Sequence, residues 1–98
     1  MSRFSELIKQ DKPVLVDFFA EWCGPCKAMS PILKDLKATL GDEITILKID
    51  VDKNQELASK LQVRGVPTLV LYKSGNQVWR QSGVVQKQDL LQVIKHSN

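Results

Sequence analysis

Apolar residues recur along the chain with two different periods, one typical of helices and one typical of buried strands. Residues 2–10 carry apolar side chains at helical spacing, which predicts a short helix. The run Val14–Phe19 follows and is apolar except for Asp17. Such a nearly continuous run is typical of a strand that is buried on both faces of a sheet.

A longer helix is predicted between Pro25 and Gly41. Proline is favoured at the first position of a helix, where its missing N–H costs no hydrogen bond. Glycine commonly ends a helix. Between the two, an apolar stripe runs from Ile32 to Leu40, and we expect this face of the helix to pack on the core.

The second half of the chain predicts three more strands, at residues 44–50, 68–73 and 78–82. Two more helices are predicted, at residues 54–61 and 87–96. Turn residues Ser74–Gln77 join the last two strands into an antiparallel hairpin. Because strands and helices alternate, the first two strands should be parallel and joined by a right-handed crossover. The predicted fold class is therefore α/β, with a four-stranded mixed sheet and four helices on both of its faces.

The length of 98 residues indicates a single domain, residues 1–98. The hydrophobic fraction of 43% and the charged fraction of 26% are ordinary for a globular protein, and they exclude a disordered tail, a collagen and a coiled-coil rod. No apolar run has the length of a membrane-spanning helix. The first ten residues lack the apolar core of a secretory signal, although a signal that had already been removed would leave no trace.

The charge pattern does not point to a nucleic-acid or membrane partner. The chain has 14 basic and 11 acidic residues and a net charge of +3. The basic residues are scattered, and no known nucleic-acid-binding motif is present. We expect neither nucleic acid nor a membrane among its partners.

The chemistry of the chain centres on two cysteines, Cys23 and Cys26, which lie where the first strand leads into the long helix. The start of a helix offers unpaired N–H groups and the positive end of the helix dipole, which lower the pKa of a thiol and stabilise the thiolate. Cys26 is one turn further along, within disulfide reach, and we expect it to point inward and to be the less exposed of the two. The pair suits a two-step thiol–disulfide exchange.

Other uses of the cysteines are weaker alternatives. A purely structural disulfide that closes so small a loop would contribute only about 2 kcal/mol. A structural zinc site needs about four ligands, and His96 is the one other soft ligand in the sequence. A metal cluster shared between two chains is a further alternative. We therefore predict a catalytic dithiol and no metal.

The residues around the cysteines resemble the thioredoxin family. The family's active-site run matches Trp22-Cys23-Gly24-Pro25-Cys26-Lys27. The other landmarks follow the family's order and spacing from Phe4 to Ile94, and they are Val16-Asp17-Phe18, Ala20-Glu21, Pro31, Lys48, Asp52, Arg64-Gly65-Val66-Pro67-Thr68, Gly75 and Gly83.

The chain departs from the family pattern in two places. Phe19 stands where many members have tryptophan. Only three residues precede Phe4, so the first strand of the family is expected to be missing. The family's strand order then places residues 44–50 at an edge of the sheet, where unpaired backbone groups are open to another chain. We expect a monomer, with weak dimerisation through this edge as the alternative.

The resemblance implies a protein-disulfide reductase, and the absence of a signal together with the reducing type of motif predicts the cytoplasm as its compartment. Cys23 would be the nucleophile and Cys26 the resolving cysteine. Gly24 and Pro25 would tune the pair towards reduction, since neither has a charged or hydrogen-bonding side chain. The chain itself would hold no cofactor, because NADPH and flavin belong to a partner thioredoxin reductase, and its substrates would be disulfide-containing client proteins.

Two ionisable residues are expected to support the cysteines. A buried Asp17 must be paired or protonated, and desolvation should raise its pKa. By resemblance it lies beneath Cys26 and accepts its proton; the alternative is a structural carboxylate. Lys48 shares a strand face with apolar residues, so we expect it to point partly inward, and by resemblance its ammonium approaches Asp17. Alternatively, it is an edge lysine whose stem covers apolar surface.

The resemblance also implies a substrate-binding rim around Cys23. Its members would be Trp22, Pro25, Val66, Pro67, Gly83 and Val84, with Thr68 contributing less. The bond between Val66 and Pro67 would be cis and would present the backbone of Val66 to an extended substrate segment. Two alternatives use the same features: a dithiol protein dedicated to one pathway, and a non-catalytic subunit that binds a partner through this rim.

Overall fold

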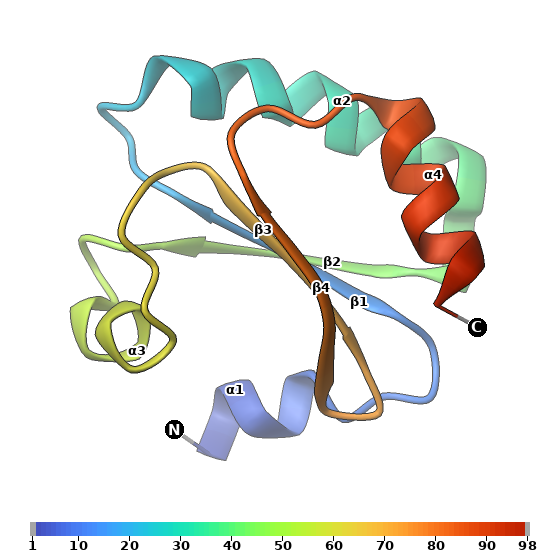
Figure 1. The fold of residues 1–98 in the computed structure, drawn as a ribbon, viewed down its shortest axis with the longest axis horizontal. Coiled ribbons are helices and arrows are strands. Elements are labelled where there is room, and N and C mark those ends of the chain that lie inside the picture. Colours follow the sequence, from blue (N-terminus) through green and yellow to red (C-terminus); the bar gives the residue numbers. More distant parts are fainter. Residues whose placement is uncertain (1, 98) are drawn as a thin grey trace.

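A computed structural model describes residues 2–97 of the chain (Figure 1). Its helices are α1 (Ser2–Leu7), α2 (Gly24–Leu40), α3 (Gln55–Lys60) and α4 (Lys87–His96), with one 3-10 turn, η1 (Gly41–Glu43). Its strands are β1 (Val14–Phe19), β2 (Thr45–Asp50), β3 (Thr68–Lys73) and β4 (Asn76–Ser82). The predicted order of helices and strands is confirmed.

The strands form one mixed sheet in the order β2-β1-β3-β4. β1 is parallel to β2 and antiparallel to β3, and β3 forms the hairpin with β4. The register places Asp17 opposite Lys48. As predicted, β2 lies at an edge of the sheet that residues 2–97 form.

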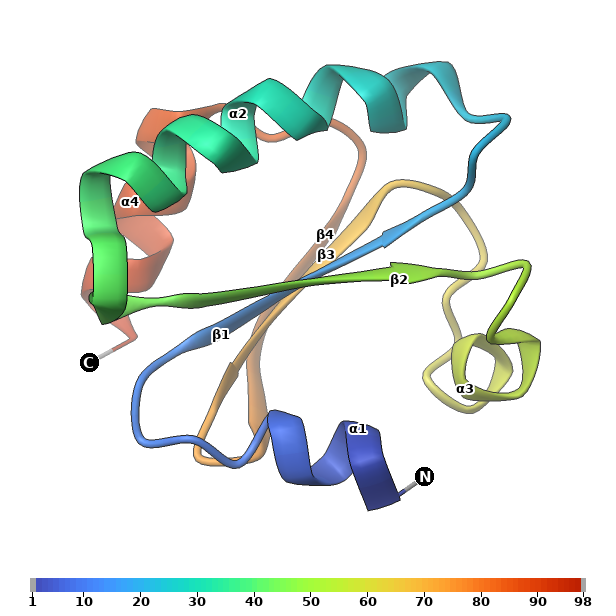
Figure 2. The same ribbon diagram turned by 180° about the vertical axis from the view of Figure 1, so that it is seen from behind.

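Helices cover both faces of the sheet. α2 and α4 lie on one face, and α1 and α3 lie on the other (Figures 1 and 2). Leu15 of β1 packs with the buried residues of α2 and α4, and its neighbours Val14 and Val16 belong to a second cluster on the opposite face. β1 is therefore apolar on both faces, because each face meets a layer of helices.

The hairpin turn is tighter than the sequence predicts. Ser74 and Gly75 alone make the turn, with φ values of 53° and 86°, and β4 begins at Asn76. Positive φ at both positions is typical of the type I′ turn, a two-residue turn that matches the twist of its strands. The predicted four-residue turn was therefore wrong. Because Ser74 adopts the left-handed conformation beside Gly75, two residues complete the turn, and β4 begins two residues earlier than predicted. The N–H of Gly75 also donates to the carbonyl of Ile8 (2.9 Å), which ties the turn to the end of α1.

Leu36 provides a test of the core beneath α2. Its side chain is fully buried in the cluster that joins α2, α4 and the sheet. Replacing Leu36 with Ala removes apolar contacts and leaves a cavity, so we expect the free energy of unfolding to fall by about 2–5 kcal/mol in a urea titration. The matched control is Lys34→Ala on the same helix, an exposed site where a change within about 0.5 kcal/mol is expected. Equal losses in the two variants would contradict this packing.

Candidate active site

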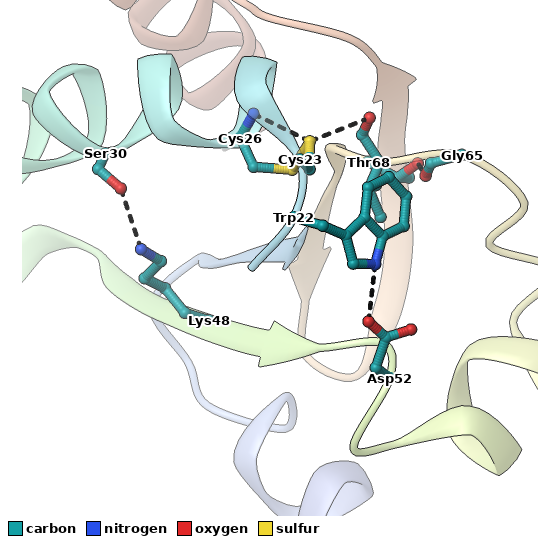
Figure 3. Close-up of a disulfide and its surroundings, with 9 residues drawn as sticks. Trp22, Cys23, Cys26, Ser30, Lys48, Asp52, Gly65 and Thr68 are labelled. Atoms are coloured by element: carbon teal, nitrogen blue, oxygen red, sulfur yellow. Dashed lines mark hydrogen bonds between the residues drawn. A yellow bond between two sulfur atoms is a disulfide. The ribbon is translucent and has the colours of Figure 1, made fainter. Parts of the chain in front are cut away.

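The cysteines lie at the junction between β1 and α2. β1 ends at Phe19, and Cys23 occupies the N-cap of α2 while Cys26 lies in its first turn. The two form a disulfide with their Cα atoms 5.3 Å apart (Figure 3). The chain therefore places the pair at the positive end of a 17-residue helix.

A backbone hydrogen bond distinguishes the two sulfur atoms. The N–H of Cys26 donates to Sγ of Cys23 at 3.1 Å. The first turn of α2 contains no acidic residue that would oppose a negative charge. Negative charge that develops on Cys23 during disulfide cleavage is thus stabilised by this N–H and by the helix dipole.

The prediction that Cys26 is less exposed than Cys23 was wrong. The exposed fractions are 4% for Cys23 and 5% for Cys26. Phe19, Val51 and Val66 pack against the cluster of the two cysteines and Ala20, and the carbonyl oxygen of Val66 lies 3.6 Å from Sγ of Cys23. Exposure therefore does not separate the two cysteines, whereas position relative to the helix does.

The segment around Pro67 closes over the pair from the other side. The bond between Val66 and Pro67 is cis, as the resemblance implies. Thr68 Oγ1 donates to the carbonyl of Gly65 (2.6 Å) and shares a hydrogen bond with Ser82 Oγ (3.0 Å). The N–H of Gly83, a residue with φ of 95°, donates to the carbonyl of Pro67 (2.8 Å). These bonds bring the end of the loop before β3 and the start of the loop after β4 together beside the disulfide.

The residues predicted as a rim differ in how they face solvent. Trp22 is 72% exposed and Val84 is 38% exposed. Gly24 and Pro25 are exposed as well, whereas Val66 is half-buried and Pro67 is buried. Pro67 thus reaches this surface through its backbone, and Trp22 provides the largest exposed apolar side chain.

Trp22 is held by Asp52, a residue for which the sequence predicts no role. The indole N–H donates to Oδ2 of Asp52 at 2.8 Å, as Figure 3 shows. Trp22 follows the end of β1, and Asp52 follows the end of β2. The carboxyl ends of parallel strands lie at the same edge of a sheet. The predicted parallel pairing of these two strands could therefore have indicated that Trp22 and Asp52 lie close together.

Asp17 is a buried carboxylate without a hydrogen-bond partner among the described residues. Its exposed fraction is zero, and neither of its oxygens is bonded. Burial raises its pKa to about 6, with the positive charge of Lys48 acting in the opposite direction. The predicted upward shift is confirmed. Asp17 lies on the same face of β1 as Leu15, beneath the helix that carries Cys26.

Lys48 is exposed rather than turned partly inward. Its ammonium donates to Oγ of Ser30 at 3.1 Å (Figure 3). It also lies 5.0 Å from the centre of the Phe19 ring. These two contacts hold the ammonium, so it acts on Asp17 only through its charge. Ser30 is not among the predicted site residues, although its place four residues after Cys26 puts it on the same helix face.

Within residues 2–97, no three His, Cys, Asp or Glu side chains are grouped as metal ligands would be. The described part of the chain likewise contains no helix long and apolar enough to cross a bilayer.

The sequence matches the family model for thioredoxin over residues 1–96. A thioredoxin of Rickettsia bellii is 40% identical over 92 residues, which cover 94% of this chain and 88% of that protein. The chloroplastic thioredoxin Y of Oryza sativa is 43% identical over 95 residues, which cover 96% of this chain but only 56% of the rice protein.

Solved structures agree with the sequence relatives. The oxidised mitochondrial thioredoxin 3 of Saccharomyces cerevisiae superposes with a TM-score of 0.86 at 36% identity, covering 97% of this chain and 88% of that one. A mutant thioredoxin of Halobacterium salinarum gives a TM-score of 0.87 at 38% identity, covering 98% and 83%. The chain belongs to the thioredoxin family, and it is a disulfide oxidoreductase with Cys23–Cys26 as its redox-active pair.

Proposed function

We propose that the protein is a general protein-disulfide reductase. The Cys23 thiolate attacks one sulfur of a substrate disulfide, so that a mixed disulfide forms and the other substrate sulfur leaves as a thiolate and takes up a proton. The thiolate of Cys26 then attacks Sγ of Cys23 and releases the second substrate thiol. The protein ends with the Cys23–Cys26 disulfide, and the substrate has gained two electrons and two protons.

The hydrogen bond from the Cys26 N–H to Sγ of Cys23 is the observation that carries this proposal. It favours charge on Cys23 both when that sulfur attacks and when it leaves the pair. Gly24 and Pro25 add no charge between the cysteines, which favours the reducing direction over the oxidising one.

Asp17 is proposed as the proton acceptor for Cys26. It is buried on the face of β1 beneath α2, and its oxygens are not occupied by other hydrogen bonds. Its pKa of about 6 lies close to neutral pH. At that pH Asp17 is largely ionised, and it is a stronger base than an ordinary carboxylate. Lys48 is a modulating residue in this scheme, since its charge lowers the pKa of Asp17.

The rim around Cys23 is proposed to bind an extended segment of the client protein. Trp22, Pro25 and Val84 provide exposed apolar surface. The backbone of Val66 adjoins the sulfur of Cys23, while Thr68 and Gly83 hold the flanking chain. Backbone pairing with such a segment depends little on its sequence, which suits a reductase with many substrates.

A thioredoxin reductase that carries NADPH and flavin is the proposed electron donor, so the chain itself needs no cofactor. The cytoplasm remains the predicted compartment, although the relatives include a chloroplastic protein of rice.

The proposed function is tested by coupling NADPH oxidation through a thioredoxin reductase to the reduction of insulin disulfides. We expect catalytic turnover by the full chain, none by Cys23→Ser, and accumulation of a mixed disulfide with Cys26→Ser. A dedicated or purely binding protein would show no turnover with any of several reductases, and that result would count against a general reductase.

Replacing Asp17 with Asn should change how stability depends on pH. The folded protein binds the Asp17 proton more tightly than the unfolded chain, with pKa values of about 6 and 3.8, so the wild type loses stability as pH rises through this window. A difference of this size corresponds to about 3 kcal/mol. At pH 7 we expect the free energy of unfolding of oxidised Asp17→Asn, measured by urea titration, to exceed that of wild type by up to about 3 kcal/mol. This difference in free energy should narrow towards pH 4. Asp42→Asn, an exposed control, should follow the wild-type pH profile.

The same substitution should slow the second chemical step. Without a carboxylate to accept the proton of Cys26, we expect release of the mixed disulfide at pH 7 to slow by on the order of 100-fold or more. Formation of the mixed disulfide by Cys23 should stay within about twofold of wild type. Single-turnover mixing with acid quench measures both steps, and unchanged release would assign Asp17 a structural role only.

A further inference from the structure

α3 ends in a conformation that usually requires glycine. Leu61 is the C-cap, and Gln62 follows with φ of 57°. The N–H of Val63 donates to the carbonyl of Ala58 (2.9 Å), and that of Gln62 donates to the carbonyl of Ser59 (3.0 Å). This pair of bonds is a Schellman motif, whose left-handed position is most often glycine. A residue with a Cβ atom adopts that conformation at a cost of about 1 kcal/mol.

The guanidinium of Arg80 binds two carbonyls of this motif. Nη1 donates to the carbonyl of Leu61 at 2.6 Å, and Nη2 donates to the carbonyl of Gln62 at 2.7 Å. Arg80 is in β4, where it pairs with Val70 in the hairpin ladder. Two donors in one rigid plane fix the direction as well as the distance of the peptide they hold. β4 thereby holds the beginning of the loop at residues 62–67, which leads from α3 to β3.

The far end of this loop is held by the bonds already described, from Thr68 to Gly65 and from Gly83 to Pro67. Val66 lies between Gly65 and Pro67, the two residues bonded at this far end, and its carbonyl oxygen is 3.6 Å from Sγ of Cys23. The bonds at Gly65 and Pro67 hold Val66 directly, and Arg80 fixes where the chain that leads to Val66 leaves α3.

We propose that Arg80 is a positioning residue for substrate recognition, which holds the loop at residues 62–67 so that the backbone of Val66 meets an extended polypeptide beside Cys23. The inference rests on the proposed function, because it assigns Val66 to the binding of client proteins. Arg80 bonds to the loop backbone and not to the cysteines, so it leaves the reactivity of Cys23 itself unaffected. Its loss should weaken reduction of polypeptides and spare small disulfides, which need no strand pairing.

The test compares insulin with the small disulfide 5,5′-dithiobis(2-nitrobenzoate), using the full reduced chain. For Arg80→Ala we expect kcat/KM with insulin to fall roughly tenfold, mainly through KM, as loss of charge-assisted hydrogen bonds implies. The rate with the small disulfide should stay within about twofold of wild type. Arg80→Lys keeps the charge but not the paired donors and should restore only part of the loss. Arg3→Ala, an exposed arginine on α1, is the matched control and should behave as wild type with both substrates.

Equal losses with both disulfides, or no loss with insulin, would overturn the inference. Hydrogen exchange gives a readout that does not depend on activity: the amides of residues 63–66 should exchange faster in Arg80→Ala and in Arg80→Lys than in wild type. Unchanged amide exchange at residues 63–66 in the variants would overturn the role of Arg80. It would leave the proposed function standing if the wild type reduces insulin. Failure of wild type to reduce insulin, with faster loop exchange in the variants, would instead count against the proposed function. Should Arg80→Ala not fold, Arg80→Lys carries the same comparison.

Discussion

Enclosure of β1 is the constraint on which the rest of the molecule depends. The strand lies between β2 and β3 and beneath helices on both faces, so its side chains are apolar wherever chemistry does not require otherwise. Because β1 is held on all sides, the residues that follow it have a fixed position at the start of α2, where Cys23 caps the helix. The enclosure also surrounds Asp17, which is the one charged side chain of the strand.

The site combines two opposite electrostatic environments within a few residues. The helix end stabilises negative charge on Cys23, whereas burial opposes negative charge on Asp17 and raises its pKa. The start of α2 thus favours an anionic sulfur, whereas the face of β1 beneath it favours a protonated carboxyl group. Lys48 moderates the second environment from a distance, because Ser30 and the ring of Phe19 hold its ammonium.

Features that depend on spacing along the chain could be predicted from the sequence, and features that depend on contacts between distant segments could not. The apolar periods were enough to place β1 and α2, and the cysteine spacing was enough to predict a disulfide at a helix start. The equal burial of the cysteines involves Val51 and Val66, which are distant in the sequence, and the orientation of Lys48 depends on a serine of another element. Asp52 and Arg80 likewise form hydrogen bonds with residues that are distant in the sequence, and the spacing of residues along the chain does not predict such bonds.

The exposed position of Lys48 has a consequence for association between molecules. The residue lies in the middle of β2, at an open edge of the sheet in the described part of the chain. A second copy that added antiparallel to this edge and was centred there would place two ammonium groups side by side, and like charges directly opposite each other destabilise a strand pair. Lysines on edge strands are a common protection against uncontrolled sheet extension. The side chain whose charge lowers the pKa of a buried carboxyl group is therefore also placed where it would oppose the antiparallel addition of a second copy to β2.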